Sequence, residues 1–92
     1  MKFMTTWSVR PESRQEAIGR FLAGEGAPLA GVTLLGRWHS VDLSVGYTLS
    51  ESDDAAAIYR NTARWSDVMD METQVVVEDD VAGPALASIY KP

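Results

Sequence analysis

Cysteine is absent from the 92-residue chain, and histidine occurs only once, as His39. Without cysteine the chain has no disulfide, no thiolate metal site and no cysteine nucleophile. A single histidine leaves only carboxylates to complete a metal site, so we expect no metal and no cofactor. The chain also has neither the ~20-residue apolar run of a membrane span nor the apolar core of a signal peptide. These absences predict a cytoplasmic protein with no membrane partner.

Positive charge is also scarce. Eight lysines and arginines stand against 13 aspartates and glutamates, which gives a formal net charge of −5. Nucleic-acid binding depends on concentrated lysine and arginine, so the sequence predicts no nucleic-acid partner. The hydrophobic share of 46% and the charged share of 23% are those of an ordinary globular chain. We expect one domain over residues 1–92, short enough that a second copy would add appreciably to its buried surface.

The spacing of apolar residues predicts four strands and at least two helices. The strands are expected at residues 2–9, 32–40, 43–49 and 71–78. The first helix is expected to begin at Pro11 and to end near Gly24. The second helix is expected to be capped by Ser50 or Ser52, with an apolar stripe that continues to Met69. A short terminal helix, opened by Pro84, is expected within residues 81–90.

This order of elements predicts an α+β fold of the ferredoxin-like βαββαβ type. Its four-stranded antiparallel sheet has both helices on one face, which leaves the other face uncovered. The simplest cover is a second copy of the chain, so we expect a dimeric α/β barrel with a space between two sheets. The valine run at residues 75–77 is interpreted as buried on both sides.

Several separate segments resemble a known family. They are MKFMTTWSVRPE, GVTLLGRWHS, ESDDAAAIYR with the later ARWSD, and VVVEDD with the alanine-rich tail. Over nearly the whole chain they resemble the uncharacterised family called domain of unknown function 3303. The resemblance implies a ferredoxin-like domain of the dimeric α/β-barrel type. It implies no activity and assigns no site residue. Leu43 departs from the glycine-rich hairpin turn expected in such a family.

His39 is the sharpest candidate for chemistry, because a histidine can move protons near neutral pH. Strict alternation puts Arg37 on the same strand face, where it could hold an anionic group, and puts Leu34 and Trp38 together on the opposite face. Trp7 and Trp38 are candidates for a flat apolar wall, and Tyr47 for a further ligand contact. A lone histidine is nevertheless more often an ordinary hydrogen-bonding residue, and tryptophans more often fill a core or an interface.

Three functions remain open from the sequence. The leading hypothesis is a homodimeric binding or sensing module with a pocket between the two sheets for a small apolar or aromatic molecule. Its expected contacts are Trp7, Arg37, Trp38, His39 and Tyr47. The first alternative is a cofactor-free oxygenase or isomerase in which His39 is the base and Arg37 stabilises negative charge. The second is a purely structural or partner-binding dimer.

Overall fold

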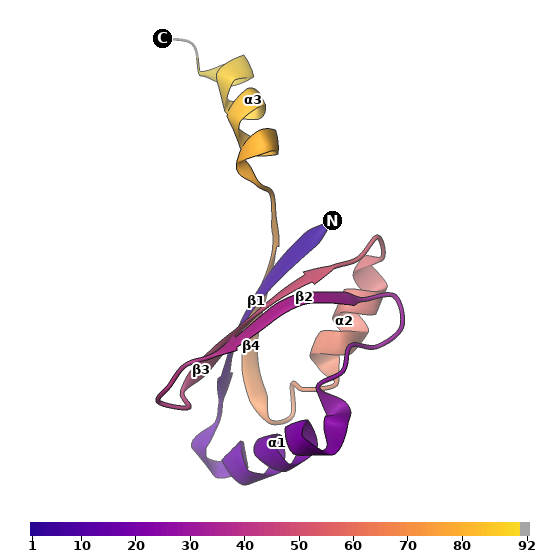
Figure 1. Cartoon of the computed structure of the whole chain (residues 1–92), viewed down its shortest axis with the longest axis vertical. Coiled ribbons are helices and arrows are strands. Elements are labelled where there is room, and N and C mark those ends of the chain that lie inside the picture. The colour runs from indigo at the N-terminus through magenta and orange to yellow at the C-terminus, as the bar shows by residue number, and fades with distance from the viewer. Residues whose placement is uncertain (91–92) are drawn as a thin grey trace.

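A four-stranded antiparallel sheet forms the centre of the structure, a computed structural model that describes residues 1–90 (Figure 1). The strands lie side by side in the order β2-β3-β1-β4, so β1 and β3 are the two central strands and the first and last strands of the βαββαβ unit, β1 and β4, pair with each other. The strands and α-helices, in chain order, are β1 (Lys2–Val9), α1 (Arg14–Arg20), β2 (Thr33–His39), β3 (Val45–Glu51), α2 (Ala55–Ala63), β4 (Met69–Val76) and α3 (Asp79–Ile89). A 3-10 turn (Pro11–Ser13) precedes α1 and a π-helical turn (Phe21–Glu25) follows it, so the three together span the helix predicted from Pro11 to near Gly24. The predicted α+β ferredoxin-like fold is confirmed.

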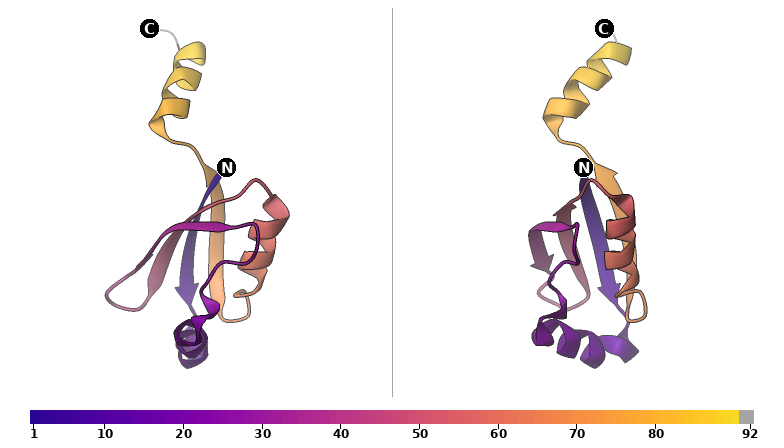
Figure 2. Two further views of the ribbon diagram at one scale, coloured as in Figure 1. Left: turned by 45° about the vertical axis from the view of Figure 1, so that its right-hand side comes forward. Right: turned by 90° about the vertical axis from the view of Figure 1, so that its right-hand side faces the viewer.

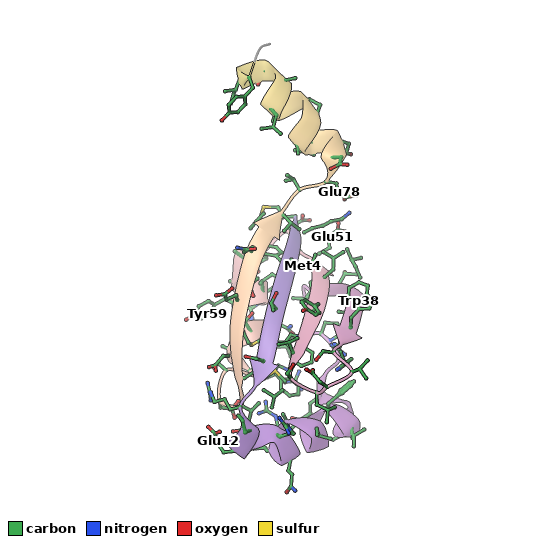
Figure 3. The ribbon with its side chains drawn as sticks, turned by 90° about the vertical axis from the view of Figure 1, so that its left-hand side faces the viewer. Met4, Glu12, Trp38, Glu51, Tyr59 and Glu78 are labelled. Carbon is green, nitrogen blue, oxygen red and sulfur yellow. The ribbon has the colours of Figure 1, made fainter. Side chains whose placement is uncertain are left out.

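In Figures 2 and 3, α2 lies against one face of the sheet and α1 crosses one end of it, whereas no helix of residues 1–90 covers the opposite face. Alternate residues of β1 face the helices, beginning with the buried Phe3. Phe3 packs with Val32, Ala57 and Ile58. A second buried cluster, Ala17, Trp65 and Val68, joins α1 to the turn after α2. The core therefore lies entirely between the sheet and its two helices.

The start of α2 differs from the predicted cap. Asp54 is the N-cap, and its carboxylate accepts a hydrogen bond of 2.9 Å from the N–H of Ala56. Ser52 is buried instead, where its hydroxyl donates to the carbonyl of Gly31 and accepts from the N–H of Asp54. Its side chain fixes the loop that enters the helix and is not free to cap it. The helix also ends at Ala63, well before Met69, which is the first residue of β4.

A β-bulge in β2 changes which residues share a face. The register with β3 shifts between Leu34 and Gly36, so Leu35 is an extra residue in the strand. Strict alternation predicted that Leu34 and Trp38 share a face, and this is wrong. Leu34 faces the helices, and beyond the bulge it is Arg37 and His39 that do so. Neither Arg37 nor His39 lies on the helix-free face that a second sheet would cover.

The last strand is an edge strand, because β4 pairs only with β1. Val75 is 58% exposed, and Val77 lies beyond the end of the strand and is exposed as well. The expected burial of the valine run on both sides is therefore wrong, because no strand of residues 1–90 pairs with the outer edge of β4. The apolar run correctly predicts a strand here, but it does not indicate whether that strand is central or at the edge of the sheet.

The terminal helix α3 stands away from the rest of the domain (Figures 1 and 2). It begins at Asp79, where Asp79 and Asp80 suit the positive end of the helix dipole, and it contains Pro84 in its interior. Pro84 was predicted to open the helix, and that prediction is wrong by more than one turn. Within residues 1–90 no helix is long and apolar enough to cross a bilayer.

Candidate functional site

A cavity of about 200 Å³ lies between the helix-facing side of the sheet and the helices. Every strand of the sheet and both packed helices contribute to its wall. The wall is mostly apolar, with hydroxyl, amide, imidazole and guanidinium groups at separate points. This is the usual composition of a small-molecule site.

The cavity has a buried end and an open end. Ala17, Ile58 and Trp65 line it and are themselves buried, so they form its floor. Leu22 and Leu43 also line it but are 81% and 59% exposed, so they lie at its mouth. Leu22 follows α1, and Leu43 belongs to the β2–β3 hairpin loop. The mouth of the cavity therefore lies between these two segments, and its floor lies at Trp65.

Three aromatic rings form one wall of the cavity. The ring of His39 lies between the other two: its centroid is 5.3 Å from the ring centroid of Trp7, in an edge-to-face contact, and 5.2 Å from that of Phe21. The indole N–H of Trp7 donates a 3.2 Å hydrogen bond to the hydroxyl of Thr48 on β3. These contacts give Trp7 and His39 fixed orientations in a wall that can receive a flat molecule.

Glycine at position 46 allows Trp7 to lie flat on β3. Gly46 is the cross-strand partner of Trp7, and a Cβ at Gly46 would come within 1.9 Å of the indole ring. No side chain fits in that space without displacing the ring. The position of Trp7 in the aromatic wall therefore requires glycine at position 46.

Two arginines reach the cavity. The guanidinium of Arg37 lies 5.5 Å from the ring centroid of Phe21 and donates a hydrogen bond from Nη2 to the carbonyl of Gly26. Burial lowers the pKa of Arg37 below its ordinary value, because desolvation disfavours the charged form. Arg14, the first residue of α1, also lines the cavity, and its Nε is buried with no hydrogen-bond partner among the described residues.

The structure brings together three of the five residues that the sequence singled out. Trp7, Arg37 and His39 line the cavity. Trp38 and Tyr47 pair with each other on the opposite, helix-free face and are 56% and 42% exposed. Figure 3 shows Trp38 on that face, which is turned towards the viewer. The candidate site therefore lies inside one chain, and two of the expected contacts are not part of it.

Arg14 and Phe21 were missed by sequence reasoning. A signal was present: Arg14, Ala17, Ile18 and Phe21 stand at i, i+3, i+4 and i+7, so they share one face of a helix. A single charged residue in an otherwise apolar stripe needs a reason to face inwards. Trp65, interpreted from the sequence as a core residue, is buried as expected, and it also lines the cavity floor.

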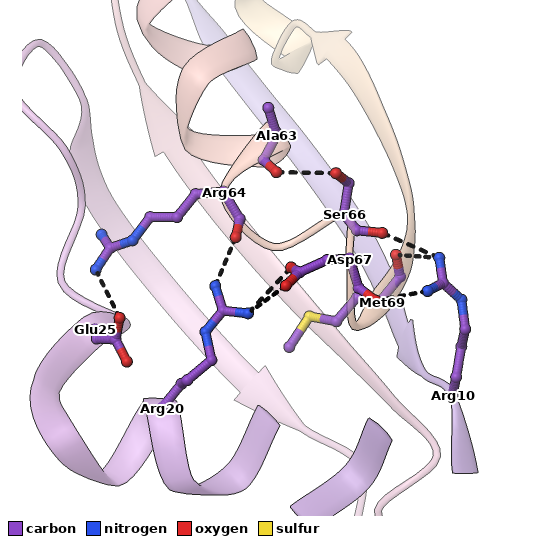
Figure 4. Close-up of polar contacts among 8 residues, drawn as sticks. All are labelled: Arg10, Arg20, Glu25, Ala63, Arg64, Ser66, Asp67 and Met69. Atoms are coloured by element: carbon purple, nitrogen blue, oxygen red, sulfur yellow. Dashed lines mark hydrogen bonds and ion pairs between the residues drawn. The ribbon is translucent and has the colours of Figure 1, made fainter. Parts of the chain in front are cut away.

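The other arginines near this end of the domain hold the turn between α2 and β4 (Figure 4). Arg10 donates to the carbonyls of Ser66 and Asp67 at 3.0 and 2.8 Å. Arg20 lies 3.0 Å from the carboxylate of Asp67 and 4.4 Å from the ring centroid of Trp65. The pKa of Asp67 is lowered, chiefly because Arg20 donates a hydrogen bond to it. These contacts explain Arg10 and Arg20 as structural residues.

No arrangement typical of a metal site occurs in the part of the chain that the structure describes: nowhere do three or more histidine, aspartate or glutamate side chains converge. The groups that remain available for chemistry are the aromatic wall and the two arginines of the cavity.

Comparison with known proteins gives a family and no activity. None of the curated proteins matches the sequence. The model of one family matches residues 1–90, which is nearly the full length of the chain. The chain belongs to the family described as domain of unknown function (DUF3303).

Proposed function

We propose that this protein binds a small, mainly apolar molecule in the cavity between its sheet and its helices. The observation that carries the proposal is the cavity itself, about 200 Å³ in volume, with a buried floor and an open mouth within one chain. An apolar cavity of about 150 Å³ in another protein is large enough for benzene. The space here suits a single ring with a short polar substituent.

The wall supports a ligand with a flat face. Trp7 and Phe21 present rings on either side of His39, and Thr48 holds the Trp7 indole in place. Offset or edge-to-face contact with such rings adds about 0.5–1.5 kcal/mol beyond area burial. A flat ligand would therefore gain more from this wall than a branched aliphatic one.

The test is an NMR titration of isotope-labelled protein with single-ring fragments of neutral and anionic kinds. We expect chemical-shift changes that centre on Trp7 and Phe21. Ala17→Leu fills the cavity floor and should weaken binding, whereas the matched control Ala63→Leu, at the exposed end of α2, should not. Shift changes confined to Trp38, or no response to any fragment, would contradict the proposal.

Catalysis is the second candidate function, and the placement of His39 and Arg37 on one cavity wall favours it. In a cofactor-free isomerase or oxygenase, His39 would accept a proton from a C–H group next to a carbonyl, and Arg37 would stabilise the resulting oxyanion. His39→Asn should then abolish turnover while fragment binding persists. A fully active His39→Asn variant would exclude this mechanism.

We also propose that two chains associate through their helix-free sheet faces. This face exposes Trp38 and Tyr47, which are cross-strand partners, and it also carries Met4 of β1, which lies across from Leu49 of β3 (Figure 3). Large exposed apolar surfaces on small domains commonly mark association sites. Sedimentation should give a dimer for the native protein and a monomer for Trp38→Glu. A native monomer at all concentrations would contradict this proposal and leave the cavity proposal intact.

A further inference from the structure

We propose that the cavity selects a carboxylate attached to an apolar body, and that Arg14 and Arg37 bind the carboxylate. This inference rests on the proposed binding function and adds the chemical class of the ligand. The guanidinium groups match the carboxylate of such a molecule, and the aromatic rings beside them match its hydrocarbon part.

The first support is the pairing of the basic residues. Within residues 1–90, every lysine and arginine except Arg14 and Arg37 lies within 4.0 Å of a carboxylate of the chain. The paired residues are Lys2, Arg10, Arg20, Arg60 and Arg64. The two that have no such partner both line the cavity. The cavity is therefore lined by the two basic side chains of residues 1–90 that form no ion pair with a carboxylate of the chain.

The second support is the buried Nε of Arg14, which has no partner among the described residues. Leaving a buried donor unsatisfied destabilises a structure, and more so when the group is charged. A carboxylate in the cavity would supply an acceptor. Arg14 also interrupts an apolar helix face, where a methionine or leucine would pack without that cost.

The third support is the surroundings of Arg37. Its only hydrogen-bond partner in residues 1–90 is the neutral carbonyl of Gly26, and its guanidinium packs over Phe21. Among residues 1–90, no aspartate or glutamate lines the cavity, although the chain as a whole carries a net charge of −5. Asp42, in the hairpin loop near the mouth, is already bound by the hydroxyls of Ser40 and Ser44.

The apolar walls limit the kind of anion. Phe21 and Ile58 have no hydrogen-bonding side-chain group, and the indole N–H of Trp7 is already bonded to Thr48, so none of the three replaces the water shell of a small hydrated dianion. A single carboxylate at the arginines, with a ring directed towards the aromatic wall, satisfies both parts of the site. We therefore infer an aromatic or similarly compact monocarboxylic acid.

The experiment compares benzoate with benzamide, which has the same ring and shape but no charge, by NMR titration of the native protein. Acetate is included as a carboxylate without the ring. We expect benzoate to bind at least about tenfold more tightly than either, because a hydrogen bond between charged groups is stronger than one between neutral groups and acetate lacks the ring. The Arg14 Nε–H resonance should shift with benzoate and not with benzamide.

Variants assign the preference to the two arginines. Arg14→Met and Arg37→Met should each abolish the preference for benzoate, whereas Arg60→Met, an equal loss of charge on the exposed face of α2, should retain it. Benzamide binding equal to benzoate binding in the native protein would overturn the inference and leave the proposed function standing. If neither benzoate nor benzamide binds to the native protein, the result contradicts the proposed function and, with it, this inference. The comparison in the native protein decides the inference even where a variant does not fold.

Discussion

Replacing Gly46 by alanine should displace Trp7 and destabilise the domain by about 2 kcal/mol. The added Cβ would lie 1.9 Å from the indole ring, so either the ring or the strand has to move. Overpacking of this kind costs about 1–3 kcal/mol, and loss of the Trp7 to Thr48 hydrogen bond costs about 1 kcal/mol more. The lower chain entropy of alanine offsets roughly 0.5–1 kcal/mol of that cost.

Urea denaturation, followed by circular dichroism, gives the free energy of unfolding of the variant. The indole N–H resonance of Trp7 reports the ring itself. Gly19→Ala is the matched control, because a Cβ at Gly19 in α1 meets nothing within 4 Å. That control should stabilise the protein by up to about 1 kcal/mol, the helix-propensity difference. If Gly46→Ala leaves both the stability and the Trp7 resonance unchanged, the close contact between Trp7 and β3 is refuted.

Three further predictions concern the loops and the cap of α2. The Ser44 hydroxyl is the largest of the groups that lower the pKa of Asp42 to about 2, so the hairpin contact stabilises the fold above the ordinary aspartate pKa of 3.8 and is lost as pH falls through about 2; NMR titration of Ser44→Ala should show a higher pKa. Leu43 has φ of 68°, so Leu43→Gly should stabilise the domain by about 1 kcal/mol in urea denaturation, and a loss of stability would contradict the strain. Asp54→Ala should cost about 1 kcal/mol as a lost N-cap, whereas an equal cost for the neighbouring Asp53→Ala would refute the cap assignment.

The fold followed from the sequence because its signals are local. Alternating residues give β1 its two faces, Pro11 precedes α1, and the order of the elements restricts the topology to the split βαβ type. The sequence also indicated an unusual turn at Leu43, where a glycine was expected, and Leu43 has a positive φ. Signals of this kind depend on neighbours in the chain and need no knowledge of tertiary packing.

The site was harder to predict, because it depends on which faces meet. A one-residue bulge at Leu35 places Leu34 and Trp38 on opposite faces, and nothing in the local pattern marks that bulge. Arg14 and Phe21 reach the cavity only because α1 crosses the end of the sheet near His39. The pocket was expected between two sheets, whereas the cavity found lies between one sheet and its own helices.

Two single positions, one in the valine run and one at the start of α2, were also predicted wrongly because their surroundings depend on the tertiary structure. Val75 has the sequence signal of a buried strand residue and is exposed because β4 is an edge strand. Ser52 has the chemistry of a cap, but it is engaged by the carbonyl of Gly31, which lies far from it in the sequence. Both outcomes depend on long-range neighbours.

The most direct test of a ligand site inside the single chain is a crystal structure of the protein grown with benzoate. Density for the ring between Trp7 and Phe21, with the carboxylate against Arg14 and Arg37, is the predicted result. Density on the helix-free face beside Trp38 and Tyr47, or an empty cavity at saturating benzoate, would contradict it.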